Sequence, residues 1–290
     1  MAIYNLGSIN ADNVYRVPHL VAPGETLAAT ALTRGLGGKG ANMSVAAARA
    51  AARVVHIGAV GSDGRWASDR LMEYGVDTRH IAQVSAPTGH ANICVDAAGE
   101  NAIVLFAGAN HAVDDGMIGA ALAEASAGDI FVTQNETNGQ PYAAQTAQGL
   151  GLRVVYAAAP FDAGAVRTVL PFLDLLVLNE VEAAQLTAET GSNLDEMAVA
   201  DIVVTMGAKG CRWMSQDAGV QDFPALEVTP VDTTGAGDTF TGYLIAGLDR
   251  GMPMAQAIDL ATQAAALMVT RVGTADVIPD LKEIQDQRLG

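Results

Sequence analysis

Asp238 directly follows the small residues Gly235, Ala236 and Gly237 in the stretch "DTTGAGDTFTGYLIAGL". The residues after the glycines form a clear helical segment, which places the small residues at its N-terminus. Backbone N–H groups exposed at such a terminus can bind an anion. A carboxylate held beside this anion hole could take a proton from a hydroxyl group that attacks a phosphoryl group. The spacing alone favours equally a simpler interpretation, in which Asp238 is a first-turn acid that stabilises the helix by ~1 kcal/mol.

A second glycine-rich stretch, "GLGGKG" at 35–40, spells G-x-G-x-x-G, and Asp63 follows at the distance expected for a dinucleotide-binding fingerprint. In that fingerprint the glycine loop joins the first strand directly to the first helix. Here a long segment lies between the first predicted strand, which ends near Gly7, and the glycines. A P-loop is also excluded, because the Gly-Lys pair is followed by another glycine instead of Ser or Thr. A helix is nevertheless predicted to begin near Ala41, so the glycines predict close approach of a polar or anionic ligand to the backbone.

The charged residues limit the ligands that this chain can bind. A net charge of −16 repels nucleic acid and anionic membranes, and it repels a phosphorylated ligand unless the site supplies local positive potential. There are three lysines; Lys39 and Lys209 lie in the glycine-rich stretches "GGKG" and "GAKG", and the third is Lys282. This distribution favours anion binding at both stretches.

Composition predicts a cytoplasmic protein with a sizeable core. The 290 residues are 50% apolar, which is ample for one large domain. No apolar run approaches the ~20 residues that span a bilayer, and we expect no signal peptide. Cys94 and Cys211 are far apart and form no C-x-x-C pair, so reduced thiols are expected. The histidines show no zinc-ligand spacing.

Strand and helix patterns alternate along most of the chain. Apolar strands, typical of a parallel sheet covered on both faces, are predicted at 2–7, 53–61, 129–136, 152–160, 173–180 and 201–210. Helices are predicted at 41–52, 65–75, 114–128, 139–151 and 180–190. This order predicts a single doubly wound α/β domain over 1–290. The strands predicted within about 12–36 and 88–106 do not fit the alternation, so we expect them to form a small β lid.

The stretches "GSINAD", "GGKGAN" and "DTTGAGDTF" together resemble the ribokinase (PfkB) family of carbohydrate kinases. The resemblance continues in order through "LNEVEAAQLT", "VVTMGAKG" and "AAALMVTRVG", across nearly the whole chain. It implies a three-layer α/β sandwich with a mostly parallel central sheet and a β lid that usually pairs two subunits into a homodimer. It also implies transfer of the γ-phosphoryl group of ATP to a sugar, with D-ribose converted to ribose 5-phosphate. Mg²⁺ and often K⁺ are the implied cofactors besides ATP.

The same resemblance implies a role for each group of candidate residues. Asp238 resembles the general base, and the anion hole beside it consists of Gly235, Ala236 and Gly237. The implied sugar-binding residues are Asp12, Gly38, Lys39, Asn42, Ala91, Ile103 and Glu136. The implied nucleotide-binding residues are Asn179, Glu182, Thr205, Gly207, Gly210 and Gly237, with Glu182 holding Mg²⁺ through water. The positions of a monovalent-cation loop are Asp232, Thr234, Met268, Arg271 and Gly273.

Simpler interpretations of several of these residues stay open on the sequence alone. Asp12 could form an Asx turn, and Glu136 could be a surface acid at the end of a strand. Asn179 and Glu182 could cap the helix at 180–190 through a capping box. Lys39 could be a solvated turn residue. Only the joint, ordered pattern favours the catalytic interpretation.

The chain departs from the family pattern at four places. Val277 stands where the family has a Ser near the cation, which removes one oxygen ligand and predicts weak potassium dependence. Tyr243 replaces a small residue, so packing behind the active-site helix must differ. The 190–201 segment is short, which predicts the loss of one peripheral helix. His90 and Asn92 add polarity to the lid, so we expect hydroxyl selectivity to change.

Two other functions compete with a ribose kinase. The first is a family kinase for another sugar or a nucleoside; because 88–106 contains no Lys or Arg, an unphosphorylated substrate is favoured. The second is a non-catalytic sugar-binding regulator on the same fold, which a degraded "GAGD" stretch would indicate. That stretch is intact here.

Overall fold

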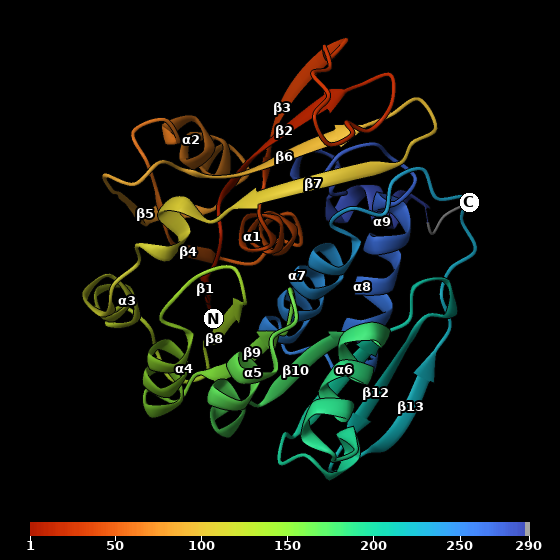
Figure 1. The fold of residues 1–290 in the computed structure, drawn as a ribbon. Coiled ribbons are helices and arrows are strands. Elements are labelled where there is room, and N and C mark those ends of the chain that lie inside the picture. The colour runs from red at the N-terminus through yellow and green to blue at the C-terminus, as the bar shows by residue number, and fades with distance from the viewer. Residues whose placement is uncertain (288–290) are drawn as a thin grey trace.

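The fold consists of two β-sheets and the helices packed on the larger one (Figure 1). A computed structural model describes residues 1–287. In spatial order, the large sheet contains β13 (Gly219–Phe223), β12 (Cys211–Ser215), β11 (Asp201–Thr205), β10 (Leu175–Asn179), β9 (Arg153–Ala157), β8 (Ile130–Gln134), β1 (Ile3–Leu6), β4 (Val54–Val60) and β5 (Asp77–Gln83). From β11 to β5 neighbouring strands are parallel, whereas β12 is antiparallel to both β11 and β13.

Helices cover both faces of the large sheet, as expected for a doubly wound fold. Buried side chains of one core cluster come from α1 (Lys39–Arg49), α2 (Arg65–Glu73), α7 (Ala236–Asp249), α8 (Met254–Met268) and α9 (Leu281–Gln287). Those of the other cluster come from α3 (Asp115–Leu122), α4 (Gln140–Gly149), α5 (Ala163–Val169) and α6 (Glu180–Thr190). The predicted three-layer sandwich is therefore confirmed. The central strands are buried throughout, which explains their apolar sequences.

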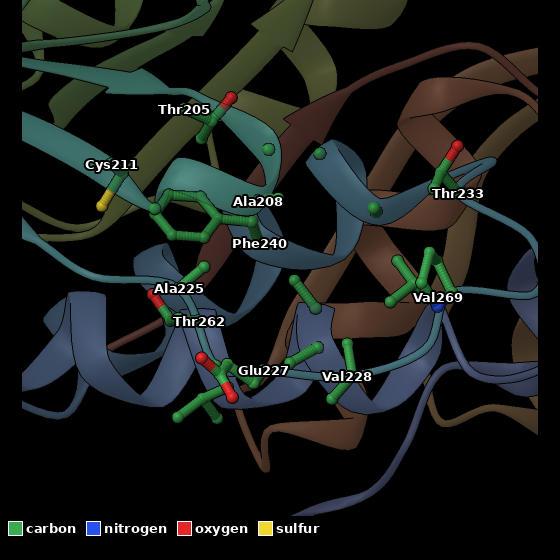
Figure 2. Close-up of a pocket in the computed structure, with 18 residues that line it drawn as sticks. Thr205, Ala208, Cys211, Ala225, Glu227, Val228, Thr233, Phe240, Thr262 and Val269 are labelled. Atoms are coloured by element: carbon green, nitrogen blue, oxygen red, sulfur yellow. The ribbon is translucent and has the colours of Figure 1, made fainter.

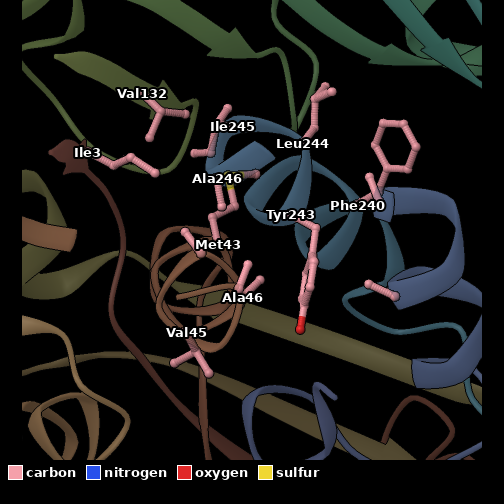
Figure 3. Close-up of a cluster of buried hydrophobic side chains, with 14 of the residues drawn as sticks. Ile3, Met43, Val45, Ala46, Val132, Phe240, Tyr243, Leu244, Ile245 and Ala246 are labelled. Carbon is pink, nitrogen blue, oxygen red and sulfur yellow. The ribbon is translucent and has the colours of Figure 1, made fainter. Parts of the chain in front are cut away.

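The contact between α1 and α7 places the two predicted glycine turns side by side. Figure 3 shows Met43 and Ala46 of α1 against Tyr243 and Ala246 of α7. Gly242 makes this approach possible, because a Cβ there would lie 2.5 Å from Ala46 Cβ.

Tyr243 packs behind α7. Its ring is fully buried, and its hydroxyl donates a hydrogen bond to the carbonyl oxygen of Pro279 at 2.5 Å. The tyrosine thus ties α7 to the segment after the predicted cation loop.

The small sheet contains β3 (Ala31–Gly37), β2 (Asn10–Arg16), β6 (Gly89–Val95) and β7 (Asn101–Phe106), at the top of Figure 1. These strands lie within the segments that the sequence set apart from the alternation. β2 is antiparallel to β3 and parallel to β6. All of β7 is exposed, including four consecutive apolar side chains at 103–106.

Some boundaries and elements differ from the expectation. α1 begins at Lys39 instead of near Ala41. The strand β5 and the hairpin of β12 and β13 were not anticipated. Between α6 and β11 the structure has one short 3₁₀ helix, Leu194–Glu196. None of the helices within residues 1–287 is long and apolar enough to cross a membrane.

Candidate active site

Asp238 lies in the first turn of α7, directly after the glycine turn. Gly235 precedes the helix in the left-handed conformation, with φ of 78°. The Asp238 side chain is buried, and Asn42 Nδ2 on α1 donates a hydrogen bond to its Oδ2 at 2.9 Å. Burial raises the pKa of Asp238, while the nearby Lys39 ammonium and the Asn42 hydrogen bond oppose that rise. The structure therefore holds this carboxylate in one orientation with a strengthened affinity for a proton.

Two further carboxylates face Asp238 across the same region. Burial and the carboxylates of Glu136 and Asp238 raise the pKa of Asp12 to about 7, and Lys39 opposes this shift. The pKa of the Lys39 ammonium is raised, chiefly by Asp238. Three acids and one lysine from segments far apart in the sequence thus gather at one point.

Glu136 is held in place by hydrogen bonds from both sides of the site. Ser8 Oγ donates to Glu136 Oε2 at 2.5 Å, and the backbone N–H of Lys39 donates to the same oxygen at 3.0 Å. The Lys39 Nζ atom lies 3.9 Å from Glu136 Oε1. Glu136 is therefore not a free surface acid, and its carboxylate is oriented at the turn that begins α1.

Other atoms of the protein occupy the space beside the glycines before α1. A Cβ on Gly37 would lie 2.0 Å from Asp12 Oδ2, so the Asp12 carboxylate lies directly over the Gly37 backbone. Gly38 has φ of 93°, and a Cβ there would lie 2.8 Å from the carbonyl oxygen of Ser8. Glycine is required at both positions so that Asp12 and the turn can approach each other.

Two cavities meet at the turn before α7. The smaller one, of about 200 Å³, is lined by Lys39, Asn179, Glu182, Thr205, Gly235, Gly237 and Asp238, among others. The larger one, of about 500 Å³, is lined mostly by small and apolar residues and is drawn in Figure 2 with Thr205, Phe240 and Thr262 labelled. Of the predicted nucleotide residues, Thr205, Gly207, Gly210 and Gly237 line this larger pocket. Thr205 and Gly237 line both cavities, so the apolar pocket leads directly to Asp238.

Asn179 and Glu182 form the capping box that was one of the two interpretations of this pair. Asn179 Oδ1 accepts hydrogen bonds from the N–H groups of Val181 and Glu182, and Glu182 Oε2 accepts from the Asn179 N–H at 2.8 Å. Both residues also line the cavity of Asp238, and burial raises the pKa of Glu182. The capping role leaves Glu182 Oε1 available to a metal-bound water, and carboxylate oxygen is a ligand that suits Mg²⁺.

Comparison with known proteins decides the family. The family model described as pfkB family carbohydrate kinase matches residues 3–281. The chain belongs to this family. It is 36% identical to a ribokinase of Haemophilus influenzae over 96% of this chain and 95% of the relative.

Solved structures agree with this kinase in fold over nearly its full length. A ribokinase of Cryptococcus neoformans in complex with ADP superposes with a TM-score of 0.86 at 32% identity, covering 99% of both chains. A ribokinase of Arabidopsis thaliana complexed with ribose and ATP superposes with a TM-score of 0.88 at 26% identity, covering 99% of this chain and 98% of the other.

The predicted cation loop lies beside the turn before α7 in this kinase. Asp232 Oδ1 accepts a hydrogen bond from the Thr234 N–H at 2.9 Å, and its Oδ2 accepts from the Gly273 N–H at 3.2 Å. Met268 reaches the same place, since its Cε would lie 3.0 Å from a Cβ on Gly235. The carboxylate therefore joins the two halves of the loop.

The donor set fits a monovalent cation only in part. Carboxylate and carbonyl oxygens are suitable ligands for a hard cation. Val277, however, packs its side chain 3.3 Å from the Cβ position of Gly273 and offers no side-chain oxygen. Its own carbonyl accepts a hydrogen bond from Arg271 Nη1 at 3.2 Å. Across residues 1–287, no three His, Cys, Asp or Glu side chains are grouped to hold a metal ion.

Three polar residues to which the sequence drew attention, Lys209, His90 and Asn92, line neither cavity. The Lys209 ammonium pairs with Glu180 at 3.0 Å on the surface, where both side chains are exposed. His90 and Asn92 do not face the sugar side of the small sheet. Asn92 accepts a hydrogen bond from Asn13, the neighbour of Asp12 on β2, and side chains alternate between faces along a strand. The two polar residues therefore cannot change hydroxyl selectivity by contact.

The two apolar lid residues differ in where they lie. Ala91 pairs with Asp12 across β2 and β6 and is buried. Ile103 is on the same face but lies opposite Ile93, further along the sheet, and is 57% exposed. Ala91 thus lies beside Asp12, and Ile103 lies further from it along the sheet.

Sequence reasoning missed Ser8 as a site residue. Its hydroxyl links the Gly40 N–H to Glu136. A lone serine after a strand carries no pattern that would have identified it.

Proposed function

We propose that this kinase transfers the γ-phosphoryl group of ATP to the 5-hydroxyl of D-ribose. One observation carries the proposal: the buried Asp238 carboxylate lies between an apolar pocket of about 500 Å³ and the carboxylates of Asp12 and Glu136. We infer that this mostly apolar pocket holds the adenosine of ATP and that Asp12 and Glu136 accept hydrogen bonds from sugar hydroxyls. The ribokinase relatives support ribose as the sugar.

The chemistry follows from the position of Asp238. Its carboxylate takes the proton of the attacking ribose hydroxyl as the new O–P bond forms and the bond between the γ-phosphorus and ADP breaks. The raised pKa favours this proton transfer, and the Asn42 hydrogen bond keeps the carboxylate aimed at the hydroxyl. Backbone N–H groups of the Gly235–Gly237 turn stabilise the charge on the transferred group.

ATP would enter as its Mg²⁺ complex, and Mg²⁺ supplies neutralisation of the phosphate charges. Asn179 and Glu182 would hold it through water. Lys39 is the cation nearest to Asp238 and Glu136, so it offsets negative charge where the sugar and the γ-phosphate meet.

The small sheet would act as a lid that covers the sugar and keeps water away from ATP. Its outer strand β7 exposes Ile103, Val104, Leu105 and Phe106 next to one another. An exposed apolar edge strand is a liability unless another chain covers it. We therefore expect a homodimer that pairs lid to lid, and a monomer in light scattering at micromolar concentration would contradict it.

The competing function within the family is a kinase for another unphosphorylated sugar or a nucleoside. The test is a coupled ADP-release screen over pentoses, hexoses and nucleosides at saturating ATP. D-ribose should give the highest kcat/KM. A higher value for a nucleoside or a hexose would replace ribose as the substrate, and ATP-binding without any sugar-dependent ADP release would favour a sugar-binding regulator.

A further inference from the structure

A group of buried polar side chains lies beneath the sugar-side turn, and the catalytic roles above leave it unused. Its members are Asn5 on β1, Ser44 on α1, His56 on β4 and Gln134 on β8, and each is at most 1% exposed. Burial of polar groups costs free energy unless they are hydrogen-bonded, so their partners show what the group does.

The hydrogen bonds fix the donor and the acceptor at each step. His56 Nε2 lies 3.0 Å from the carbonyl oxygen of Gly7, which can only accept, so Nε2 carries the proton. Burial lowers the pKa of His56 to about 4, so its Nδ1 is unprotonated at neutral pH and accepts from Ser44 Oγ at 2.8 Å. Ser44 Oγ accepts from Asn5 Nδ2 at 2.8 Å. Asn5 Oδ1 accepts from Gln134 Nε2 at 2.8 Å.

This network holds the backbone on both sides of the closest contact in the turn. Asn5 Nδ2 donates to the carbonyl oxygen of Gly40 at 2.8 Å, and His56 holds the carbonyl of Gly7. The two glycines touch, because a Cβ on Gly40 would lie 2.3 Å from Gly7 Cα. The N–H of Gly40 donates to Ser8 Oγ at 3.2 Å, so both polar groups of this residue are fixed.

Two hydrogen bonds connect Gly40 to Glu136 through Ser8. Ser8, which accepts from Gly40, donates to Glu136, and the N–H of Lys39 donates to the same carboxylate oxygen. A shift of Gly40 would therefore change the orientation of a sugar-side acid. None of Asn5, Ser44 and His56 lines either cavity beside Asp238.

We propose that Asn5, Ser44 and His56 are positioning residues for the sugar: they fix Gly40 and Ser8, and through them Glu136. The inference rests on the proposed sugar-kinase function. It predicts that breaking the network weakens sugar binding and leaves nucleotide binding intact, whereas a role in folding alone would affect neither selectively.

The test uses Ser44→Ala, His56→Phe and the double variant, each as the full chain, with the sugar that the screen identifies. Each single change leaves a buried partner without its hydrogen bond, and we expect the sugar KM to rise roughly tenfold while the ATP KM stays within about twofold. The double variant replaces both polar groups by apolar ones, so its sugar KM should rise less than the product of the single effects.

Asp129→Ala is the matched control. Asp129 is also buried and accepts hydrogen bonds from the N–H groups of Ala2 and Ser126, each at 2.8 Å, at the opposite ends of β1 and β8. It should lower the melting temperature like the network variants but leave the sugar KM unchanged.

The possible results separate the inference from the function on which it rests. Network variants that lose thermal stability with an unchanged sugar KM, or with equal rises in both KM values, would overturn the positioning role. If His56→Phe does not fold, Ser44→Ala, which removes a single oxygen, decides the question. A wild type without sugar-dependent ADP release would instead contradict the proposed function, and the inference with it.

Discussion

The two glycine turns of this kinase start their helices in the same way. Gly38 precedes α1 with φ of 93°, and Gly235 precedes α7 with φ of 78°. Neither N-cap glycine offers a side chain to its helix, but at α1 the N–H groups of Lys39 and Gly40 already donate to Glu136 and Ser8. From local sequence and backbone shape alone, both would serve as anion sites.

The two turns differ in how much space lies beside their glycines. A Cβ on Gly37 would meet the Asp12 carboxylate at 2.0 Å, and a Cβ on Gly40 would meet Gly7 Cα at 2.3 Å. Nothing lies within 4 Å of the Cβ position on Gly237. Protein atoms thus fill the space beside Gly37 and Gly40 of the first turn, whereas the space beside Gly237 of the second turn is open. We therefore propose that the G-x-G-x-x-G pattern before α1 serves a sugar site built from side chains and not a nucleotide phosphate.

The largest expected effect comes from removing the proton acceptor beside the second turn while both turns stay unchanged. Asp238→Asn keeps the size of the side chain but cannot accept the hydroxyl proton. We expect kcat to fall by ~10²–10⁴-fold while sugar and ATP affinities change little. Steady-state kinetics and calorimetric titration check this, and a variant with most of its kcat would refute the role of Asp238 as base.

A matched pair of alanine substitutions tests the contrast between the turns directly. Gly40→Ala places a methyl group 2.3 Å from Gly7 Cα, so we expect a loss of about 3 kcal/mol in the free energy of unfolding. Gly237→Ala enters open space, so the melting temperature should stay the same while kcat/KM for ATP falls roughly tenfold. Thermal unfolding and kinetics of both variants provide the comparison. Equal thermal losses would show that both turns are packing sites.

The pKa of Asp12 gives the sugar-side turn a pH dependence. The pKa of about 7 means that the ionised fraction of Asp12 rises roughly tenfold between pH 6 and pH 8. An ionised carboxylate accepts stronger hydrogen bonds from sugar hydroxyls. The sugar KM, measured at saturating ATP, should therefore fall as the pH rises through 7, and Asp12→Asn should flatten this profile. A profile that Asp12→Asn leaves unchanged would place the titrating group elsewhere.

The same ionisation affects folding in the opposite direction. Because the pKa of Asp12 is higher in the folded state than its usual value, the Asp12 carboxyl binds more protons in the folded ligand-free protein than in the unfolded chain between about pH 4 and about pH 7. The contribution of Asp12 to the free energy of unfolding therefore decreases as the pH rises from about 4 to about 7. Chemical denaturation of wild type and Asp12→Asn across this window measures it.

The smallest expected effect concerns the loop behind the second turn. Val277 offers no side-chain oxygen next to Gly273, so we expect weak activation by K⁺ and a gain of about twofold in Val277→Ser. The measurement is a KCl titration against a bulky organic cation at constant ionic strength. If the wild type saturates at low millimolar K⁺ and the substitution changes nothing, the missing ligand has no effect.

The sequence predicts much of this site because its strongest signals are local. Small residues before a helix predict the turn at Gly235, and strands outside the alternation predict the small sheet. Side chains alternate between the two faces along β6, so if Ala91 faces the sugar, then His90 and Asn92 must face away.

Residues whose role depends on distant partners could not be predicted in the same way. Lys39 and Lys209 both lie in glycine-rich stretches, yet only Lys39 of the two lies beside an acid of the site. Ser44 and His56 each look like an ordinary core residue. Their hydrogen bond joins α1 to β4, and the sequence carries no local sign of that pairing.

The structure of Asp238→Asn bound to D-ribose and ATP is the most direct test of the division between the two turns. We predict the ribose against Asp12 and Glu136 with its 5-hydroxyl next to position 238, and the γ-phosphate on the N–H groups of Gly235–Gly237. A phosphate group bound on the backbone of Gly38–Gly40, or a ribose away from both acids, would contradict it.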